Sequence, residues 1–291
     1  MPLDSISDLR KRVQEPVRKY NDVAGLLVGD RVSIHVTRLF VAFGISPTVA
    51  TLSMLAFGLA GSVMLLFGGI WAVAGFVCLF AYYVLDCVDG EVARYYRREK
   101  LAWGFHDFLF HLYVKSAFFV CLGLYAVDTS GVHAMFLFAV AALIATLFGK
   151  FLNDVGMLLT CRYVLLRNHE ERQRFVEELC AGAAPEQLLV DGDLPGEHEL
   201  YRPRGLALVR ATLTNFDLSM LLFLAAAVAD LWIEPFLIWN VRADCKVALL
   251  VFYGVILPLD FLDHVQTHIR HGRFVRDARR LLRRAHHFRI K

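Results

Sequence analysis

The chain has 291 residues, of which 57% are hydrophobic, a formal net charge of +3 and a mean hydropathy of +0.49. This apolar content is too high for an ordinary soluble globular protein and is typical of a protein that crosses a membrane several times. The six cysteines form no C-x-x-C pair and no zinc-ligand spacing, which disfavours a zinc module and predicts unpaired structural thiols.

Residues 1–46 predict an amphipathic segment on the cytoplasmic surface of the membrane. Leu9, Val13 and Val17 recur at helical spacing among lysines and arginines, a pattern typical of a helix in the membrane interface. Pro47 suits the first turn of the helix that follows. The segment either only anchors the chain or also places polar side chains at the mouth of a site. The candidates for that second role are Arg31, Ser33, Thr37 and Arg38.

Six apolar stretches follow, each near the roughly 20 residues that a helix needs to cross the hydrocarbon core. They cover residues 48–67, 70–88, 108–127, 132–152, 216–233 and 246–264. The sequence therefore predicts an all-α polytopic membrane protein. Its transmembrane domain of about six helices spans residues 47–266 and includes a soluble loop at 161–212.

Most lysines and arginines fall in four segments that lie on one side of the membrane if both termini do. These are residues 1–46, 94–100, 161–212 and 267–291. The positive-inside rule makes that side cytoplasmic, and we expect the inner (plasma) membrane of the cell. The last segment predicts a basic amphipathic helix on an anionic leaflet. Because several spans precede it, we expect contact with membrane lipids and no nucleic acid.

Ionisable residues are densest where the second and third apolar stretches meet. Asp86 and Asp89 are three residues apart, so they share a helix face. Asp107 and His111 are four residues apart and share a face of the next helix. An ionisable group at the end of a spanning helix is costly unless it is solvated, paired or bound to a cation. The carboxylates therefore predict a site for a hard cation, Mg²⁺ or Mn²⁺.

At these residues the chain resembles the CDP-alcohol phosphotransferase family. The signature of that family is D-x-x-D-G-x-x-A-R, then about eight residues, then G-x-x-x-D-x-x-x-D. The matching positions are Asp86, Asp89, Gly90, Ala93, Arg94 and Asp107. The glycine of the second half falls on Trp103, and its last aspartate falls on His111. In the family that aspartate is the proposed general base and helps to hold the metals.

The resemblance implies a membrane transferase of phospholipid or polyol-phosphate synthesis. It would move a phosphoalcohol group, phosphatidyl or similar, from a CDP-linked donor to an alcohol acceptor and release CMP. Asp107 and His111 would be catalytic, and family members are usually homodimers. The implied metal ligands are Asp86, Asp89, Asp107 and His111. The implied contacts to the donor nucleotide are Asp86, Gly90, Ala93 and Arg94. The acceptor, and the choice between CDP-diacylglycerol and a soluble CDP-polyol, stay open.

Three basic residues are candidates for binding the acceptor. Lys115 lies eight residues after Asp107 on nearly the same helix face. It either pairs with a carboxylate or contacts a phosphate. Lys150 and Arg162 lie near the end of the fourth apolar stretch. They either extend to the interface for solvation or hold a phosphorylated acceptor.

His111 admits three roles. It is a general base, since imidazole titrates near neutral pH, while the aspartates alone hold the metals. Alternatively it is a ligand, and the metal is then Mn²⁺, Co²⁺ or Zn²⁺ rather than Mg²⁺. In the third version transfer activity is lost, and the protein is a nucleotide-binding membrane protein. A small-solute transporter is a further alternative, although transport predicts polar residues near the middle of several spans.

Overall fold

The computed structural model describes most of the chain. The described residues are 5–17, 28–97, 101–166, 209–210, 213–238 and 240–271. Of the described residues, 84% are helical, which confirms the all-α prediction. The predicted loop 161–212 and the predicted basic tail 267–291 lie largely outside the described residues.

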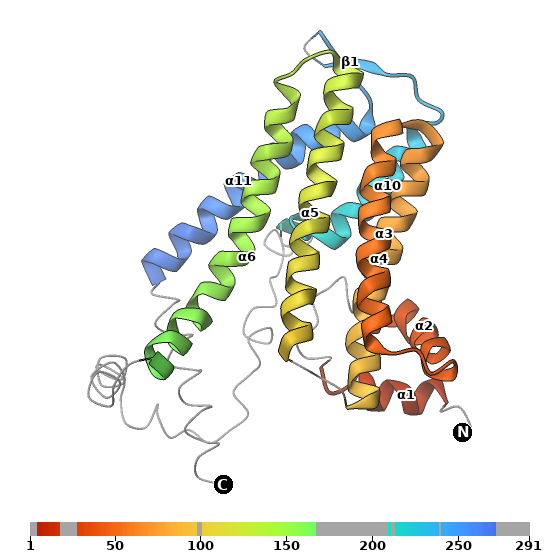
Figure 1. Ribbon diagram of the computed structural model, residues 1–291. Coiled ribbons are helices and arrows are strands. Elements are labelled where there is room, and N and C mark those ends of the chain that lie inside the picture. The colour runs from red at the N-terminus through yellow and green to blue at the C-terminus, as the bar shows by residue number, and fades with distance from the viewer. Residues whose placement is uncertain are drawn as a thin grey trace. The chain divides into compact units, whose positions relative to one another are not determined.

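Within the described part, five helices are long and apolar enough to cross a membrane (Figure 1). They are Pro47–Phe67, Gly69–Tyr96, Phe105–Ser130, Met135–Leu152 and Cys245–Thr267. The fifth predicted stretch, 216–233, differs from the prediction. Its helix α10 (Phe216–Ala229) has 14 residues and is about 21 Å long, whereas a hydrocarbon core is about 30 Å thick. The architecture is that of a polytopic membrane protein with one short apolar helix besides the long ones.

The chain divides into two compact units. The first comprises residues 1–143 and 195–256, and the second residues 144–194 and 257–291. Two helices continue from the first unit into the second, α6 (Met135–Leu166) and α11 (Cys245–His271). In the second unit the rings of Phe148 and Phe261 pack edge to face, with centroids 6.4 Å apart. The polar clusters described below belong to the first unit.

Closely packed helices form the centre of the first unit. They are α3 (Pro47–Met64), the single 3-10 turn η3 (Leu65–Phe67), α4 (Gly69–Tyr96) and α5 (Leu101–Ser130). A Cβ atom on Gly61 would lie 2.6 Å from the carbonyl oxygen of Gly75, so α3 and α4 touch backbone to backbone, as small residues allow in membrane helices. Helix α10 packs on α4, where the rings of Phe76 and Phe223 stack with centroids 5.8 Å apart.

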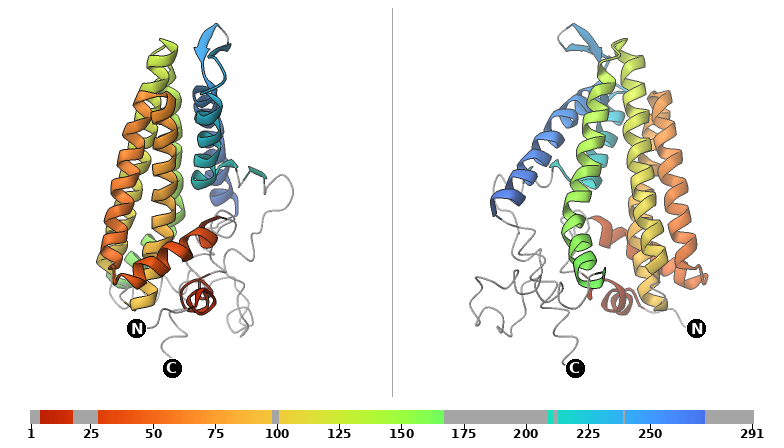
Figure 2. Two further views of the ribbon diagram at one scale, coloured as in Figure 1. Left: turned by 90° about the vertical axis from the view of Figure 1, so that its right-hand side faces the viewer. Right: turned by 60° about the vertical axis from the view of Figure 1, so that its left-hand side comes forward.

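Two shorter helices, α1 (Ile6–Val13) and α2 (Asp30–Ala42), lie crosswise beside one end of α4 (Figure 2). Leu9 and Val13 of α1 are buried against Ile34 of α2. Exposed lysine and arginine side chains occupy the other faces of α1. The amphipathic pattern read from the sequence is therefore present, and its apolar side packs on protein. We refer to this end of α4 as the motif end.

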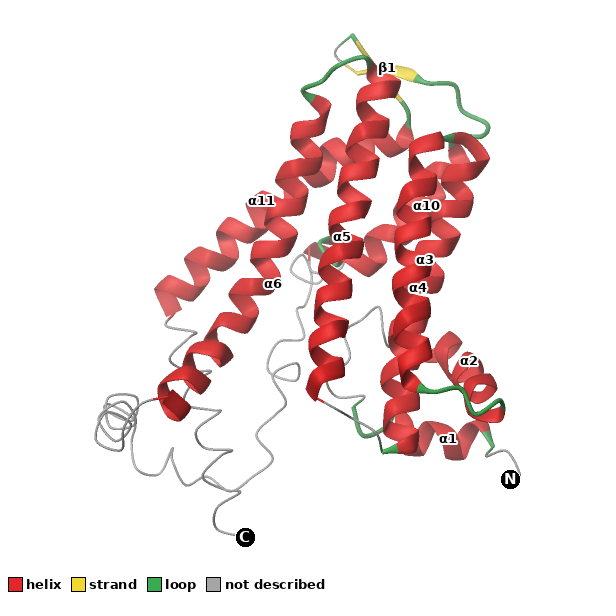
Figure 3. Cartoon of the chain, viewed as in Figure 1, coloured by secondary structure: helices red, strands yellow, loops and turns green. Residues whose placement is uncertain are grey.

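A β-hairpin separates α10 from α11 (Figure 3). Strands β1 (Phe236–Ile238) and β2 (Val241–Ala243) pair antiparallel, with Leu237 opposite Arg242, and β2 packs on α5. The predicted apolar stretches 216–233 and 246–264 leave only residues 234–245 for this connection. The hairpin brings the end of α10 and the first turn of α11 together at the end of α5 remote from the motif end.

Candidate functional site

The motif residues lie on two helices that meet at the motif end. Helix α4 carries Asp86 and Asp89 in its last three turns, and α5 carries Asp107 and His111 near its start. Arg97 ends α4 in the left-handed conformation, with φ of 52°. The two acidic segments face each other, although Asp107 follows Asp89 by 18 residues.

His111 lies between two carboxylates. Its Nε2 atom is 3.1 Å from Oδ1 of Asp86 and 3.5 Å from Oδ1 of Asp107. One ligand atom from each of these residues lies within 4.8 Å of the others. The side chain of His111 is 17% exposed, and those of Asp86 and Asp107 are about one-third exposed. These three residues form the motif cluster, a half-buried group of two carboxylates that converge on one imidazole.

Tyr82 fixes the orientation of the imidazole, and the sequence analysis did not single it out. Its hydroxyl hydrogen-bonds Nδ1 of His111, and the residue is 1% exposed. Because Nδ1 is engaged by Tyr82, Nε2 is the ring nitrogen that faces the carboxylates. The four-residue spacing from Tyr82 to Asp86, which places both on one face of α4, is the signal that points to it in the sequence.

Asp89 lies beside the motif cluster rather than within it. The side chain of Thr51 on α3 and the charges of Asp86 and Asp107 all act on its carboxylate. Among the four predicted metal ligands, the structure thus brings three together and leaves Asp89 as a neighbour.

Arg94 is held by α1. Its Nε atom donates a hydrogen bond of 2.7 Å to the carbonyl oxygen of Val13. One terminal nitrogen of its guanidinium group lies 3.1 Å from where a Cβ atom on Gly90 would be. The missing side chain of Gly90 therefore leaves room for Arg94, and Ala93 is half-buried beside it. Contact of these residues with a donor nucleotide stays a prediction.

Glu91 is a second residue that the sequence analysis did not single out. It is 2% exposed and accepts hydrogen bonds from Gln14, Ser33 and Thr37. Ser33 and Thr37, proposed from the sequence for the mouth of the site, thus bind this carboxylate. The donors lie 54 to 77 residues away in the chain, so no local pattern reveals the contact.

Of the three basic candidates for acceptor binding, Lys115 belongs to the same unit as the motif cluster. The ammonium group of Lys115 lies 5.0 Å from the ring centroid of Phe216, and its charge acts on His111. Lys150 is half-buried and belongs to the second unit. The side chain of Arg162 is outside the described residues. Lys115 is therefore the candidate that the described residues associate with the motif cluster.

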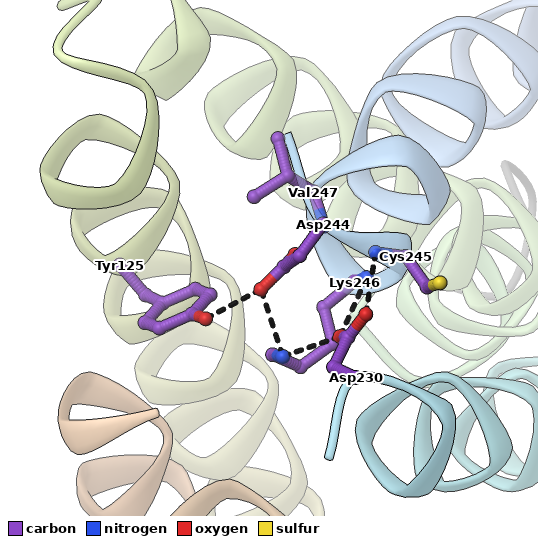
Figure 4. A network of polar contacts seen from close by, with 6 residues as sticks. All are labelled: Tyr125, Asp230, Asp244, Cys245, Lys246 and Val247. Atoms are coloured by element: carbon purple, nitrogen blue, oxygen red, sulfur yellow. Dashed lines mark hydrogen bonds and ion pairs between the residues drawn. The ribbon is translucent and has the colours of Figure 1, made fainter. Parts of the chain in front are cut away.

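A second polar cluster lies beside the β-hairpin (Figure 4). The ammonium group of Lys246 is 2.5 Å from Oδ2 of Asp230 and 2.9 Å from Oδ2 of Asp244, and it lies 5.0 Å from the ring centroid of Tyr125. The Tyr125 hydroxyl donates a hydrogen bond of 2.5 Å to Asp244. The Lys246 side chain is 2% exposed and those of both aspartates are 6% exposed. These four residues form the hairpin network.

Backbone groups of α11 complete the hairpin network. Asp230 accepts a hydrogen bond of 2.8 Å from the amide of Cys245, and Asp244 accepts one of 2.9 Å from the amide of Val247. The positive end of the helix dipole and Lys246 together offset the two carboxylates. This arrangement joins α5, α10 and α11 and is structural in character.

Comparison with family models and with curated proteins found no match to the chain.

Proposed function

We propose that the chain is an integral membrane transferase that moves a phosphoalcohol group from a CDP-linked donor to an alcohol acceptor and releases CMP. One observation carries the proposal. Asp86, Asp107 and His111 come from two spanning helices and present their ligand atoms within 4.8 Å of one another. Converging anions at a half-exposed helix end suit a cation that clamps a pyrophosphate.

The donor set of the motif cluster fits a divalent cation. Two carboxylate oxygens and one imidazole nitrogen are an acceptable ligand set for Mn²⁺, Co²⁺ or Zn²⁺, and the nitrogen makes Mg²⁺ less suited. Asp86, Asp107 and His111 would hold the ion, with Asp89 available beside them. When bound, the cation would neutralise phosphate charge and stabilise the departing phosphate.

The transfer itself also needs a base, an oriented imidazole and a positive charge near the acceptor. The acceptor hydroxyl attacks the phosphorus of the phosphoalcohol group, a new P–O bond forms, and the bond to the CMP oxygen breaks. A base at the motif cluster takes the hydroxyl proton. If His111 is a ligand, that base is a carboxylate oxygen not bound to the ion; if the aspartates alone hold the ion, it is Nε2 of His111. Tyr82 holds the imidazole in one orientation. Lys115 adds positive charge for a phosphorylated acceptor.

The motif end is assigned to the cytoplasm, where CDP-linked substrates are found. Exposed basic side chains gather there, namely Arg10, Lys11, Arg31 and Arg97. Such a bias marks the cytoplasmic side. We propose the inner (plasma) membrane as the location and a homodimer as the assembly.

Release of CMP by the purified full-length protein tests the proposal. CDP-diacylglycerol and a soluble CDP-polyol are supplied in parallel, each with Mg²⁺ or Mn²⁺ and a pool of polyol acceptors. Asp86→Asn should lower the rate at least about 100-fold, because removing even an indirect metal partner costs 10- to 100-fold. Glu234→Gln makes the same chemical change at an exposed position by the hairpin and should leave the rate unchanged. No CMP from wild type with either donor would refute the proposal.

A further inference from the structure

Glu91 carries a buried carboxylate on α4, and this carboxylate faces away from the motif cluster. Glu91 lies five residues after Asp86, which places it about 140° around the helix from the α4 member of the motif cluster. Its exposed fraction is 2%, whereas the motif cluster is open to solvent on the other side of α4. A charged group buried this deeply needs several donors, and it is therefore committed to the contacts that it makes.

Those contacts come from α1 and α2, which we call the surface helices. Gln14, just after α1, donates through Nε2 at 2.7 Å. On α2, Ser33 donates at 2.6 Å and Thr37 at 2.5 Å. Hydrogen bonds to a charged acceptor are roughly twice as strong as neutral ones. The four residues form the Glu91 clamp, which holds α1 and α2 on the last turns of α4.

Further contacts extend the clamp along the end of α4. Arg94 donates to the carbonyl oxygen of Val13 on α1 at 2.7 Å. In the opposite direction, Arg12 of α1 donates to the carbonyl oxygen of Tyr95 at 3.1 Å, and its guanidinium lies 4.1 Å from the Tyr95 ring centroid. Near the start of α2, a Cβ atom on Gly29 would lie 2.7 Å from the Tyr83 hydroxyl. The two surface helices thus fit α4 closely over several turns.

The position of α4 decides the geometry of the motif cluster. Asp86 lies on α4, while its partners Asp107 and His111 lie on α5. A rotation of the end of α4 would change the 3.1 Å distance between Asp86 and His111. A displacement of about 1 Å among reacting groups can lower a rate about 100-fold. The surface helices hydrogen-bond to Glu91 on a face of α4 away from the cluster. These bonds oppose such a rotation.

We propose that Glu91 is a positioning residue. Through it, α1 and α2 fix the rotation of the last turns of α4, and with it the spacing of Asp86 from Asp107 and His111. The surface helices are then part of the catalytic apparatus, and they act on it through Glu91. The expected kinetic effect rests on the proposed transferase function, but the expected structural effect does not.

Two variants of equal size separate positioning from simple attachment. Glu91→Leu removes the acceptor of the Ser33 and Thr37 hydroxyls, whereas Gln14 keeps the carbonyl oxygen of Asp30. Glu91→Gln keeps an acceptor oxygen for Gln14 and Ser33, and its amide group can donate to the Thr37 hydroxyl. Glu15→Leu makes the first replacement at an exposed position just after α1 and serves as the control. Ser33→Ala and Thr37→Val each remove one donor and give a graded series if Glu91→Leu does not fold.

Hydrogen–deuterium exchange of the full-length protein in lipid nanodiscs measures the structural effect. In Glu91→Leu we expect exchange at least about tenfold faster both in α1–α2 and in residues 86–97, with α10–α11 unchanged. In the CMP-release assay, kcat should fall about 100-fold with little change in the KM for the donor. Glu91→Gln should restore most of both properties, and Glu15→Leu should match wild type.

Faster exchange in α1–α2 with wild-type exchange in residues 86–97 would overturn the proposal, because the clamp would then only attach the surface helices. Wild-type exchange in both segments would overturn it as well. A wild-type protein that releases no CMP would refute the transferase function, and the exchange pattern would still decide the positioning role. A fall in kcat without faster exchange in residues 86–97 would also count against it.

Discussion

Two polar clusters of the first unit each place two aspartates around one basic side chain, Lys246 in one and His111 in the other. The two clusters are built in opposite ways. In the hairpin network, Lys246 lies within 2.9 Å of both carboxylates, and every one of these side chains is at most 6% exposed. In the motif cluster, His111 hydrogen-bonds one carboxylate at 3.1 Å, and the aspartates are about one-third exposed. The first cluster is closed, and the second is open to a ligand.

The difference lies in how charge is balanced. The hairpin network combines two carboxylates with a permanent cation, a tyrosine hydroxyl and the first amides of α11. The motif cluster gathers two carboxylates about an imidazole that need not be charged, with a third carboxylate beside them. Satisfied buried ions stabilise a fold only while they remain paired. Converging anions that are half-exposed are suited to binding a cation instead.

The clusters are also separated in space. His111 and Tyr125 are 14 residues apart on α5, a rise of about 21 Å. Substitutions at sites more than 7–10 Å apart usually act independently. Changes in the hairpin network should therefore alter stability, and changes in the motif cluster should alter ligand binding and activity.

The largest effect is expected from Lys246→Met, which leaves two buried carboxylates without their cation. Breaking a buried ion pair by removing one partner costs about 3–5 kcal/mol. Thermal unfolding in detergent should show a midpoint far below that of wild type. Arg242→Met, an exposed position on β2, is the matched control. Equal midpoints for the two variants would mean that the hairpin network does not stabilise the fold.

His111→Ala should have the next largest effect, on metal binding rather than on stability. If Nε2 is a ligand, its loss should weaken Mn²⁺ binding about 10- to 100-fold. The affinity is measured from the shift of the unfolding midpoint with Mn²⁺ concentration. His111→Asp should restore binding and favour Mg²⁺, because the ligand set is then all oxygen. Wild-type Mn²⁺ binding by His111→Ala together with lost CMP release would instead make His111 a general base.

Tyr82→Phe should give a smaller loss at the motif cluster. The variant keeps the aromatic ring and removes the hydroxyl that engages Nδ1, so the imidazole can rotate. Residues that orient a metal ligand typically contribute 10- to 100-fold to affinity, and we expect about tenfold because the buried ring still restricts the imidazole. Tyr113→Phe, an exposed tyrosine on α5, controls for loss of a hydroxyl. Equal Mn²⁺ affinity in both variants would remove Tyr82 from the site.

The sequence predicts one site of Asp86, Asp89, Asp107 and His111, of which the structure brings three together. It gives no sign of the hairpin network, and the reason is physical. Asp86 lies three residues before Asp89, and Asp107 lies four residues before His111. Ionisable groups at the ends of apolar stretches can be seen without a structure. Asp230 and Lys246 meet only because a hairpin folds between them. The apolar stretch 216–233 has nearly the length of a full span. In the structure, α10 ends at Ala229, and Asp230 accepts a hydrogen bond from the first amide of α11.

The Glu91 clamp was equally hidden. A glutamate inside an acidic motif resembles its neighbours in sequence, and its partners Ser33 and Thr37 are polar residues of an amphipathic helix. Their spacing of four residues places them on one face of α2, but nothing local says what covers that face. Long-range hydrogen bonds therefore set the part of the site that sequence patterns cannot predict.

Tyr125→Phe should have the smallest effect and sharpens the distinction between the clusters. It removes one hydrogen bond to Asp244, yet that carboxylate keeps Lys246 and the amide of Val247. We therefore expect a loss of about 1 kcal/mol in the free energy of unfolding. Because Tyr125 lies on the same helix as His111, the variant also tests independence directly. A change in Mn²⁺ affinity would show that α5 couples the two clusters, whereas an unchanged affinity beside a lower unfolding midpoint would confirm that one end of the helix holds the fold and the other binds the ligand.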